Sequence, residues 1–454
     1  MRSAFIFRRD LRLVDNLGLL AAAKESDEVV CCFVLDPRQA QDHPYRSLNA
    51  LEFMFRSLLE LDEELHKRGA RLVVFEGSPE DAVRVLVKDH GVKAVHVNED
   101  YTPFSIERDK ALKTVCESLG IAFHQHFDLL LSKPGEVLTK QGTPYSVFTP
   151  FYKAAIEHSV PAPQGVPDIS FVSIKAGVDL KEAFTRYVSS PNPDLAVRGG
   201  RKEGLELLDR AIELSEYGKR RNFPSQSYTT RLSAHHKFGT VSIRETYHAA
   251  KEAFGPGCKL ISELYWRDFY SHISYHHPRV FGEAFREDYS DVEWDADEEK
   301  LKKWCDGLTG FPIVDAGMRE LVKTGYMHNR VRMIVASFLT KDLHLDWLLG
   351  ERFFAQHLVD YDPAVNNGSW QWASSTGADG APYFRIFNPW SQQVRFDEDC
   401  EYIKKWVPEL ADIPAKALHK LFEQRPLGMP DSYPKPMVDH SVEREEALRR
   451  FKVL

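Results

Sequence analysis

The chain has 454 residues, of which 43% are hydrophobic and 28% charged, a composition typical of a globular protein with several domains. Its formal net charge of −8 argues against bulk attraction to nucleic acid, so a local basic surface would have to hold any anionic partner. The six cysteines show no CxxC pair or metal-like grouping with histidine, and no run of about 18 apolar residues occurs. We therefore expect a cytoplasmic protein with reduced thiols, no disulfide, no metal site and no membrane contact.

Short β-type runs alternate with helical patterns through the first part of the chain. The runs are 4–8, 29–35, 71–75, 94–98 and 121–125, and the clearest helical patterns are 51–67, 79–89 and 106–119. This alternation predicts an α/β domain with a doubly wound parallel sheet, Rossmann-like in topology. No GxGxxG follows any of the strands, so the dinucleotide fingerprint is missing. Ligands of such sheets usually lie where the strands end, which draws attention to 8–10, 36–38 and 98–101.

After His126 the strand and helix patterns weaken, and proline becomes frequent up to Pro193. This segment is typical of a long connector on the surface. We predict an antenna-type α/β domain over residues 1–127, a connector over 128–198 and a large all-α domain over 199–454.

The helical domain begins with a pattern over 204–217 and a locally basic stretch that contains Lys219, Arg220 and Arg221. The sequence Thr229-Thr230-Arg231-Leu232-Ser233 then precedes another helical pattern. Hydroxyl groups and free amides at a helix start can bind phosphate, although a simple helix cap is the commoner use.

Glu263, Trp266, Arg267 and Tyr270 have the spacing i, i+3, i+4 and i+7, which places all four on one face of a helix. Such a stripe requires either a buried polar network or a ligand wall, and we favour the ligand wall.

A further helix is predicted from Tyr326 to Trp347, with Asn329 and Met333 one turn apart and with Arg330 and Arg332 on different faces. One of these arginines can pair internally while the other meets a phosphate.

The stretch 360–389 is too aromatic for an ordinary loop and too rich in glycine for a helix. Its π-surfaces and its adaptable backbone suit the floor of a site for a planar ring system. A buried omega-type loop is the alternative.

These motifs together resemble the DNA photolyase/cryptochrome family, and most closely the class I cyclobutane pyrimidine dimer photolyases. Thr229–Ser233, Glu263–Tyr270, Gly325–Met333 and Asn366–Trp372 carry the resemblance, with Phe7–Arg12 as a weaker match near the N-terminus. The family holds a U-shaped FAD in its helical domain and, under blue light, transfers an electron from reduced flavin to a dimer flipped out of DNA.

The resemblance implies three groups of site residues. The flavin contacts would be Tyr217, Thr229, Thr230, Arg231, Leu232, Ser233, Asp360, Tyr361, Asp362 and Asn366, with Asn366 beside the flavin N5. The lesion pocket would contain Glu263, Trp266, Asn329, Met333 and Trp372. The DNA-facing residues would be Arg221, Arg267, Tyr270, Arg330 and Gln392.

The resemblance also implies that Trp370, Trp347 and Trp304 form an electron route from the surface to the flavin. Asn329 and Met333 stand where (6-4) photolyases carry histidine, which favours the cyclobutane dimer as substrate. The partner is then UV-damaged DNA, with no obligate protein partner, and the protein is expected to be a monomer. A cryptochrome-like photoreceptor, a (6-4) photolyase and a light-independent DNA-binding flavoprotein are the alternatives.

The sequence departs from the family pattern in two places. Ser369 replaces a common glycine beside the proximal tryptophan, and Phe104-Ser105 replaces the Asn-Glu pair that holds a folate antenna. A deazaflavin or a second flavin is therefore favoured over folate as the antenna chromophore.

Overall fold

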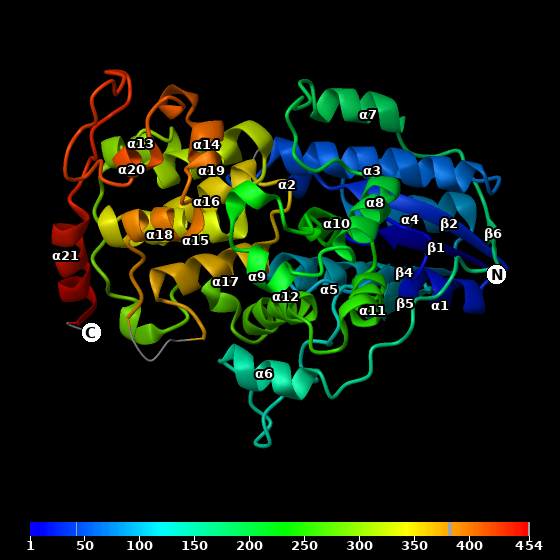
Figure 1. The fold of residues 1–454 in the computed structure, drawn as a ribbon. Coiled ribbons are helices and arrows are strands. Elements are labelled where there is room, and N and C mark those ends of the chain that lie inside the picture. The colour runs from blue at the N-terminus through cyan, green and yellow to red at the C-terminus, as the bar shows by residue number, and fades with distance from the viewer. Residues whose placement is uncertain (42, 380–383, 453–454) are drawn as a thin grey trace.

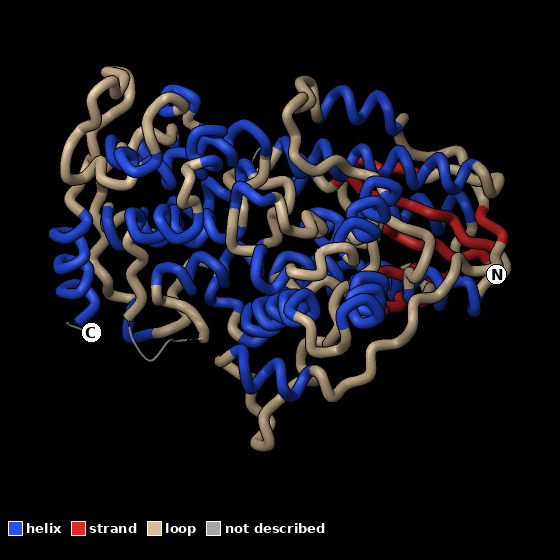
Figure 2. Tube along the Cα trace, viewed as in Figure 1, coloured by secondary structure: helices blue, strands red, loops and turns tan. Residues whose placement is uncertain are grey.

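The computed structural model describes residues 1–41, 43–379 and 384–452. A parallel sheet with covering helices occupies one end of the molecule, and helices make up the rest (Figure 1). Figure 2 shows the strands gathered at the end that holds the N-terminus.

The sheet contains β1 (Arg2–Phe7), β2 (Glu28–Leu35), β3 (Val73–Glu76), β4 (Ala94–Asn98), β5 (Ala122–His126) and β6 (Ser170–Phe171). The strand order is β3-β2-β1-β4-β5, every pair is parallel, and β6 joins β2. The first and last residues of each predicted run lie within two residues of those of an observed strand. The doubly wound α/β fold class is therefore confirmed.

Helices cover both faces of this sheet, and the strands show why. Phe5 and Phe7 of β1 join one core with α3, while Ala4 and Ile6 join a second core with α4 and α5. The helices of this region are α1 (Leu17–Glu25), α2 (Pro37–Ala40), α3 (Leu48–His66), α4 (Pro79–His90) and α5 (Pro103–Ser118). Alternate side chains thus point to opposite layers, as expected for a strand buried on both faces.

The predicted connector contains more regular structure than its proline content indicated. It includes α6 (Phe148–Ala155), β6 and α7 (Leu180–Tyr187). β6 pairs with Glu28 and Val29, the end of β2 that precedes its pairing with β3. The connector thus returns to the sheet.

The remaining helices form the helical domain. They are α8 (Arg201–Ala211), α9 (Tyr217–Arg220), α10 (Ser233–Phe238), α11 (Ile243–Phe254), α12 (Lys259–His276), α13 (Glu298–Cys305), α14 (Pro312–Thr324), α15 (Asn329–Ser337), α16 (Trp347–His357), α17 (Pro363–Ser374), α18 (Pro389–Phe396), α19 (Glu401–Trp406), α20 (Ala415–Leu418) and α21 (His440–Lys452). Single 3-10 turns occur at η1 (Pro224–Gln226), η2 (Pro278–Val280), η3 (Glu287–Tyr289) and η5 (Pro408–Leu410).

The prediction of one continuous helix from Tyr326 to Trp347 is wrong. Helix α15 begins at Asn329, passes into the π-helical turn η4 (Phe338–Asp342) and ends before α16 begins at Trp347. The buried Lys341 lies in this turn and donates from Nζ to the carbonyl of Ser374 at 2.7 Å. This hydrogen bond satisfies a polar group that would otherwise be unpaired in the core.

The stretch 360–389 was judged too rich in glycine for a helix, but its residues 363–374 form α17. Residues 380–383 of the stretch lie outside the described residues. A Cβ atom on Gly368 would lie 2.1 Å from the ring of Tyr270. Glycine is therefore needed so that α17 can approach α12, and tertiary packing outweighs its low helix propensity.

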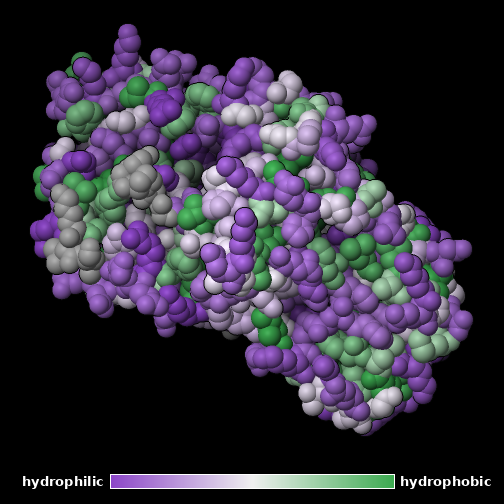
Figure 3. All heavy atoms as spheres, turned by 90° about the horizontal axis from the view of Figure 1, so that it is seen from below, coloured by the Kyte–Doolittle hydropathy of each residue, from purple (hydrophilic) through white to green (hydrophobic). Residues whose placement is uncertain are grey.

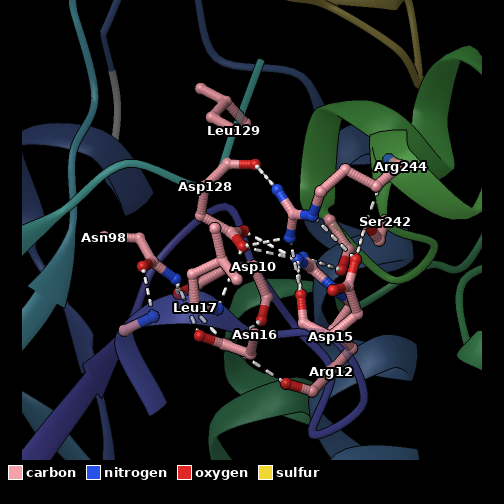
Figure 4. A network of polar contacts seen from close by, with 12 residues as sticks. Asp10, Arg12, Asp15, Asn16, Leu17, Asn98, Asp128, Leu129, Ser242 and Arg244 are labelled. Carbon is pink, nitrogen blue, oxygen red and sulfur yellow. Dashed lines mark hydrogen bonds and ion pairs between the residues drawn. The ribbon is translucent and has the colours of Figure 1, made fainter. Parts of the chain in front are cut away.

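A buried network of charges joins the two parts of the molecule (Figure 4). The guanidinium of Arg12 donates to both oxygens of Asp128, at 2.8 and 2.7 Å. Arg244, at the start of α11, donates to Asp128 at 2.7 Å and to Asp15 at 2.9 Å. Burial would raise the pKa of Asp128, but Arg12 and Arg244 outweigh it and hold that pKa below its usual value. The Asp128 carboxylate is therefore ionised and depends on its two arginine partners.

Within the described ranges, no helix combines the length and apolar character needed to cross a membrane. All six cysteines are free thiols, as expected. The face in Figure 3 is mainly hydrophilic, with hydrophobic side chains in small groups. Most large apolar side chains instead lie in the cores on the sheet and between the helices.

We predict that Arg244→Ala lowers the free energy of unfolding by about 3–5 kcal/mol, because it leaves buried carboxylate charge without its partner. Lys302→Ala, which removes an exposed ion pair with Asp306, is the matched control and should leave the free energy of unfolding nearly unchanged. Chemical denaturation of both variants measures the difference. Equal losses in the two would show that the buried network contributes no more than a surface pair.

Candidate active site

Helix α12 presents Glu263 and Trp266 at a partly exposed surface. Glu263 pairs with Arg221 and, at 2.9 Å, with Lys259. Trp266 stacks on Phe148 of α6 with ring centroids 3.8 Å apart and nearly parallel planes. The carboxylate and the indole are thus held in place by neighbours on other elements.

Arg267 and Tyr270, which were predicted to face DNA, point inward instead. The guanidinium of Arg267 donates to the carbonyls of Leu129 at 2.7 Å and His236 at 3.2 Å. Tyr270 is 8% exposed and packs against Gly368 of α17. The close approach of α17 therefore covers Tyr270, while carbonyls of the connector and α10 hold the partly exposed Arg267, although the helical spacing was read correctly.

Arg267 belongs to a buried cluster of charges between the two parts of the molecule. Arg9 pairs with Asp362 and, at 3.2 Å, with Asp100. Burial, followed by the nearby Arg9, lowers the pKa of Lys237 to about 8. Burial also lowers the pKa of Arg267. These three cations face Asp100 and Asp362, and Asp268 also acts on Arg267.

The stretch from Thr229 to Ser233 turns sharply before α10. Arg231 has a φ of 55°, in the left-handed region, and its guanidinium lies 5.5 Å from the ring centre of Tyr326. Arg231 also lines a cavity of about 910 Å³ together with Glu320, Phe353 and Trp406. Leu232 is buried, while Thr229, Thr230 and Tyr217 are partly buried and Ser233 is exposed.

Several residues that were predicted to contact the flavin lie at or near the start of α17. Asp362 caps the helix by accepting from the amides of Ala364 and Val365. Asn366, one turn later and 7% exposed, donates from Nδ2 to the carbonyl of Glu351 at 3.0 Å. Asp360 accepts from Arg332 at 3.0 and 3.2 Å, and Tyr361 beside it is partly buried. Arg332 is therefore the arginine that pairs internally.

Arg330 belongs to a second cluster of cations, nearer the surface. Burial, together with Arg221, Arg395 and Arg385, lowers the pKa of Arg330 to about 10. The guanidinium of Arg385 lies 4.2 Å from the ring centre of Trp372. We call Arg221, Arg330, Arg385 and Arg395 the arginine patch, and a polyanion would relieve their mutual repulsion.

The other predicted lesion and DNA residues are also accessible. Asn329 is exposed and donates to the sulfur of Met333 at 3.8 Å, and Met333 is partly buried. Gln392 of α18 and Trp372 are partly buried. Trp370, two residues from Trp372 on α17, is 2% exposed, so the two indoles face opposite sides of the helix as predicted.

The predicted electron route needs a correction at its surface end. Trp304 is 0% exposed, so it cannot be the residue that meets solvent, although its ring contacts that of Trp370 at a centroid separation of 6.1 Å. Trp347 is 3% exposed.

The partly exposed Trp294 was not among the predicted route residues. The amide of Asp295 donates to the carbonyl of His344 at 2.8 Å, which places Trp294 beside the segment leading into Trp347. Its partial exposure depends on this tertiary pairing, which no sequence pattern signals. Arg385 and Arg395 were also missed, because only tertiary packing brings them near Arg330.

Comparisons with known proteins agree with this geometry. A family model described as DNA photolyase matches residues 3–168, and one described as the FAD binding domain of DNA photolyase matches residues 260–453. A deoxyribodipyrimidine photo-lyase of Halobacterium salinarum is 38% identical over 99% of this chain and 98% of its own length.

Two crystal structures have nearly the same fold. An archaeal photolyase from Sulfolobus tokodaii with two FAD molecules is 43% identical, covers 100% of both chains and has a TM-score of 0.91. A bacterial class III photolyase from Agrobacterium tumefaciens is 35% identical, covers 100% of this chain and 98% of its own, and has a TM-score of 0.90.

The helical part of the chain is thus an FAD-binding domain. We propose that the cluster of Arg9, Lys237 and Arg267, beside Asp362, binds the diphosphate of FAD and that Asp360 and Asn366 contact its flavin ring.

We predict that Arg267→Ala weakens FAD binding about 10- to 100-fold, or about 1.4–2.7 kcal/mol, because a buried cation near the diphosphate is lost. Titration of flavin-free protein with FAD measures the change, and Arg395→Ala in the surface patch is the control. Unchanged FAD affinity with weaker DNA binding in Arg267→Ala would restore the original assignment of Arg267 to DNA.

Proposed function

The chain belongs to the DNA photolyase family, and on that premise we propose that it repairs cyclobutane pyrimidine dimers in DNA under blue light, with FAD as catalytic cofactor. The observation that carries the proposal is the position of the arginine patch. Arg221 of this patch pairs with Glu263, Arg385 lies over the ring of Trp372, and both lie near enough to Arg330 to act on its charge, as Arg395 does. A flipped base could therefore reach the cofactor site from a surface that binds the DNA backbone.

Each residue of the outer surface has a role in this proposal. The arginine patch binds phosphates on both sides of the lesion, which compensates locally for the net charge of −8. Trp266 and Trp372 provide flat apolar surfaces for the flipped bases. Glu263 accepts a hydrogen bond from a base N3–H, while its partner Arg221 lies where a base carbonyl needs a donor.

The inner surface provides the other half of the reaction. When bound and reduced, FAD supplies the electron that light drives onto the dimer and that returns after the ring opens. Asn366 provides an amide, which can hydrogen-bond to the cofactor without releasing a proton. Trp370, Trp347 and Trp294 form the route by which electrons from an external reductant, such as a thiol, reach the cofactor site.

The cyclobutane dimer is favoured over the (6-4) photoproduct by Asn329 and Met333. Neither side chain can act as a proton donor of the kind that (6-4) repair needs, and their mutual contact occupies the position of such a donor. We also propose that the protein is a class I photolyase, on the basis of the motifs in its helical domain.

We place the antenna chromophore at the carboxyl edge of the sheet, in the unit formed by residues 1–127. Arg38 and Arg108 lie 5.0 and 6.0 Å from the ring centre of Phe104, and Arg8 pairs with Asp109 at 2.8 Å. Cations beside an aromatic ring suit a planar chromophore that carries phosphate. A deazaflavin or a second flavin is favoured, and the Sulfolobus tokodaii relative contains two FAD molecules.

The direct test mixes flavin-loaded, reduced protein with an oligonucleotide that contains one cyclobutane dimer, under blue light and in the dark. We predict loss of the dimer only in the light, and no loss of a (6-4) photoproduct in a parallel sample. Absence of light-dependent repair would contradict the proposal and favour a photoreceptor, while equal loss in the dark would indicate light-independent chemistry.

We also predict that Trp294→Phe slows photoreduction of the oxidised cofactor about tenfold or more, equivalent to at least about 1.4 kcal/mol in the barrier. Repair by chemically reduced protein should be unchanged, since the outer surface is intact. Trp304→Phe is the comparison, and a larger effect there than in Trp294→Phe would make Trp304 part of the route and exclude Trp294.

A further inference from the structure

A cluster of histidines lies on the sheet, on a face that the repair site does not use. His96 of β4 and His124 of β5 are direct cross-strand partners, and Glu25 is the last residue of α1 on the same face. In Figure 1, α1, β4 and β5 lie towards the end of the molecule that holds the N-terminus, away from α14 to α21. The sequence spacing of these residues resembles no metal-binding motif, because strand pairing alone brings them together.

The potential ligand atoms of the cluster converge on one point. Nε2 of His96 lies 3.8 Å from a carboxylate oxygen of Glu25, and Nε2 of His124 lies 3.5 Å from the same oxygen. All three ligand atoms lie within 4.8 Å of one another. Bonds of about 2.05 Å in a tetrahedral zinc site place ligand atoms roughly 3.3 Å apart. Because the rings of His96 and His124 are stacked, the partly exposed side chains of His124 and Glu25 must rotate to close the site.

A second observation also indicates a ligand. His96 is 0% exposed, and its Nε2 atom has no hydrogen-bond partner. A buried polar atom without a partner carries a free-energy cost that folded proteins seldom accept. Stacking of the rings of His96 and His124, with centroids 4.7 Å apart, accounts for their parallel planes but leaves this nitrogen unsatisfied.

The other ring nitrogen of His96 is already engaged. Its Nδ1 atom lies 3.1 Å from Nε2 of His126, also on β5. Metal-binding histidines usually have such a partner on the second nitrogen, which orients the ring and fixes the tautomer. With a proton on Nδ1, the Nε2 atom of His96 keeps a free lone pair.

We propose that His96, His124 and Glu25 bind one divalent transition-metal ion of the zinc class, with His126 as the residue that positions His96. Two imidazoles and one carboxylate are ligands that suit zinc. The side chains of His124 and Glu25 are 37% and 46% exposed, which leaves a fourth position open to water. The ion attaches the end of α1 to β4 and β5, and so stabilises the edge of the sheet.

The test uses the flavin-loaded protein after removal of metal by a chelator, with Zn²⁺ alone as the titrant in calorimetry. We expect one ion per chain. Glu25→Gln and His124→Asn, both at the surface, should each weaken binding by at least about 100-fold, since loss of even an orienting partner costs 10–100-fold. His158→Asn and Glu107→Gln replace exposed residues outside the cluster and should bind Zn²⁺ as the parent does.

Thermal unfolding with and without Zn²⁺ separates loss of the site from loss of the fold. The unfolding temperature of the parent should rise with Zn²⁺, while that of Glu25→Gln and His124→Asn should match the metal-free parent and not respond. No stoichiometric binding by the parent, or equal binding by the ligand variants and the controls, would overturn the proposal. Flavin absorbance should not change in any sample, because the ion lies outside the cofactor site.

Discussion

The buried charges of Arg12, Asp128, Arg244 and Asp15 are the constraint on which the rest of the structure depends. They come from the loop after β1, the start of the connector and the start of α11, and their side chains are at most 3% exposed. A displacement of the helical domain relative to the sheet would separate ions that water cannot reach. The pair of Arg9 and Asp362 continues this constraint to the first turn of α17.

Helix α17 converts that fixed interface into a site with two sides. Its inner side carries Asp362, Asn366 and Trp370, and its outer side carries Trp372 beside Arg385. Gly368 lets α12 approach closely enough that Arg267 joins the inner charges while Glu263 remains at the surface. The same pair of helices thus separates a cation cluster suited to a buried diphosphate from one suited to the DNA backbone.

Local patterns predicted the strands within two residues and the helical face of Glu263 and Trp266, since both depend on periodicity. Predictions failed where distant contacts decide. Gly368 lowers helix propensity, but packing against Tyr270 requires it there. Arg9 and Asp362 are separated by 353 positions, so no spacing could reveal their pairing. The depth of Trp304 and the convergence of His96 on His124 likewise follow from tertiary packing and strand register.

We propose that the cluster of Arg9, Lys237 and Arg267 binds the cofactor while the arginine patch binds DNA. The salt dependence of DNA binding in Arg330→Ala tests this division most directly. The affinity of flavin-loaded protein for dimer-containing DNA should fall steeply with salt, and the slope of log affinity against log salt should decrease by about 1 in the variant. Flavin retention should not change. An unchanged slope, or loss of flavin from Arg330→Ala, would contradict the account.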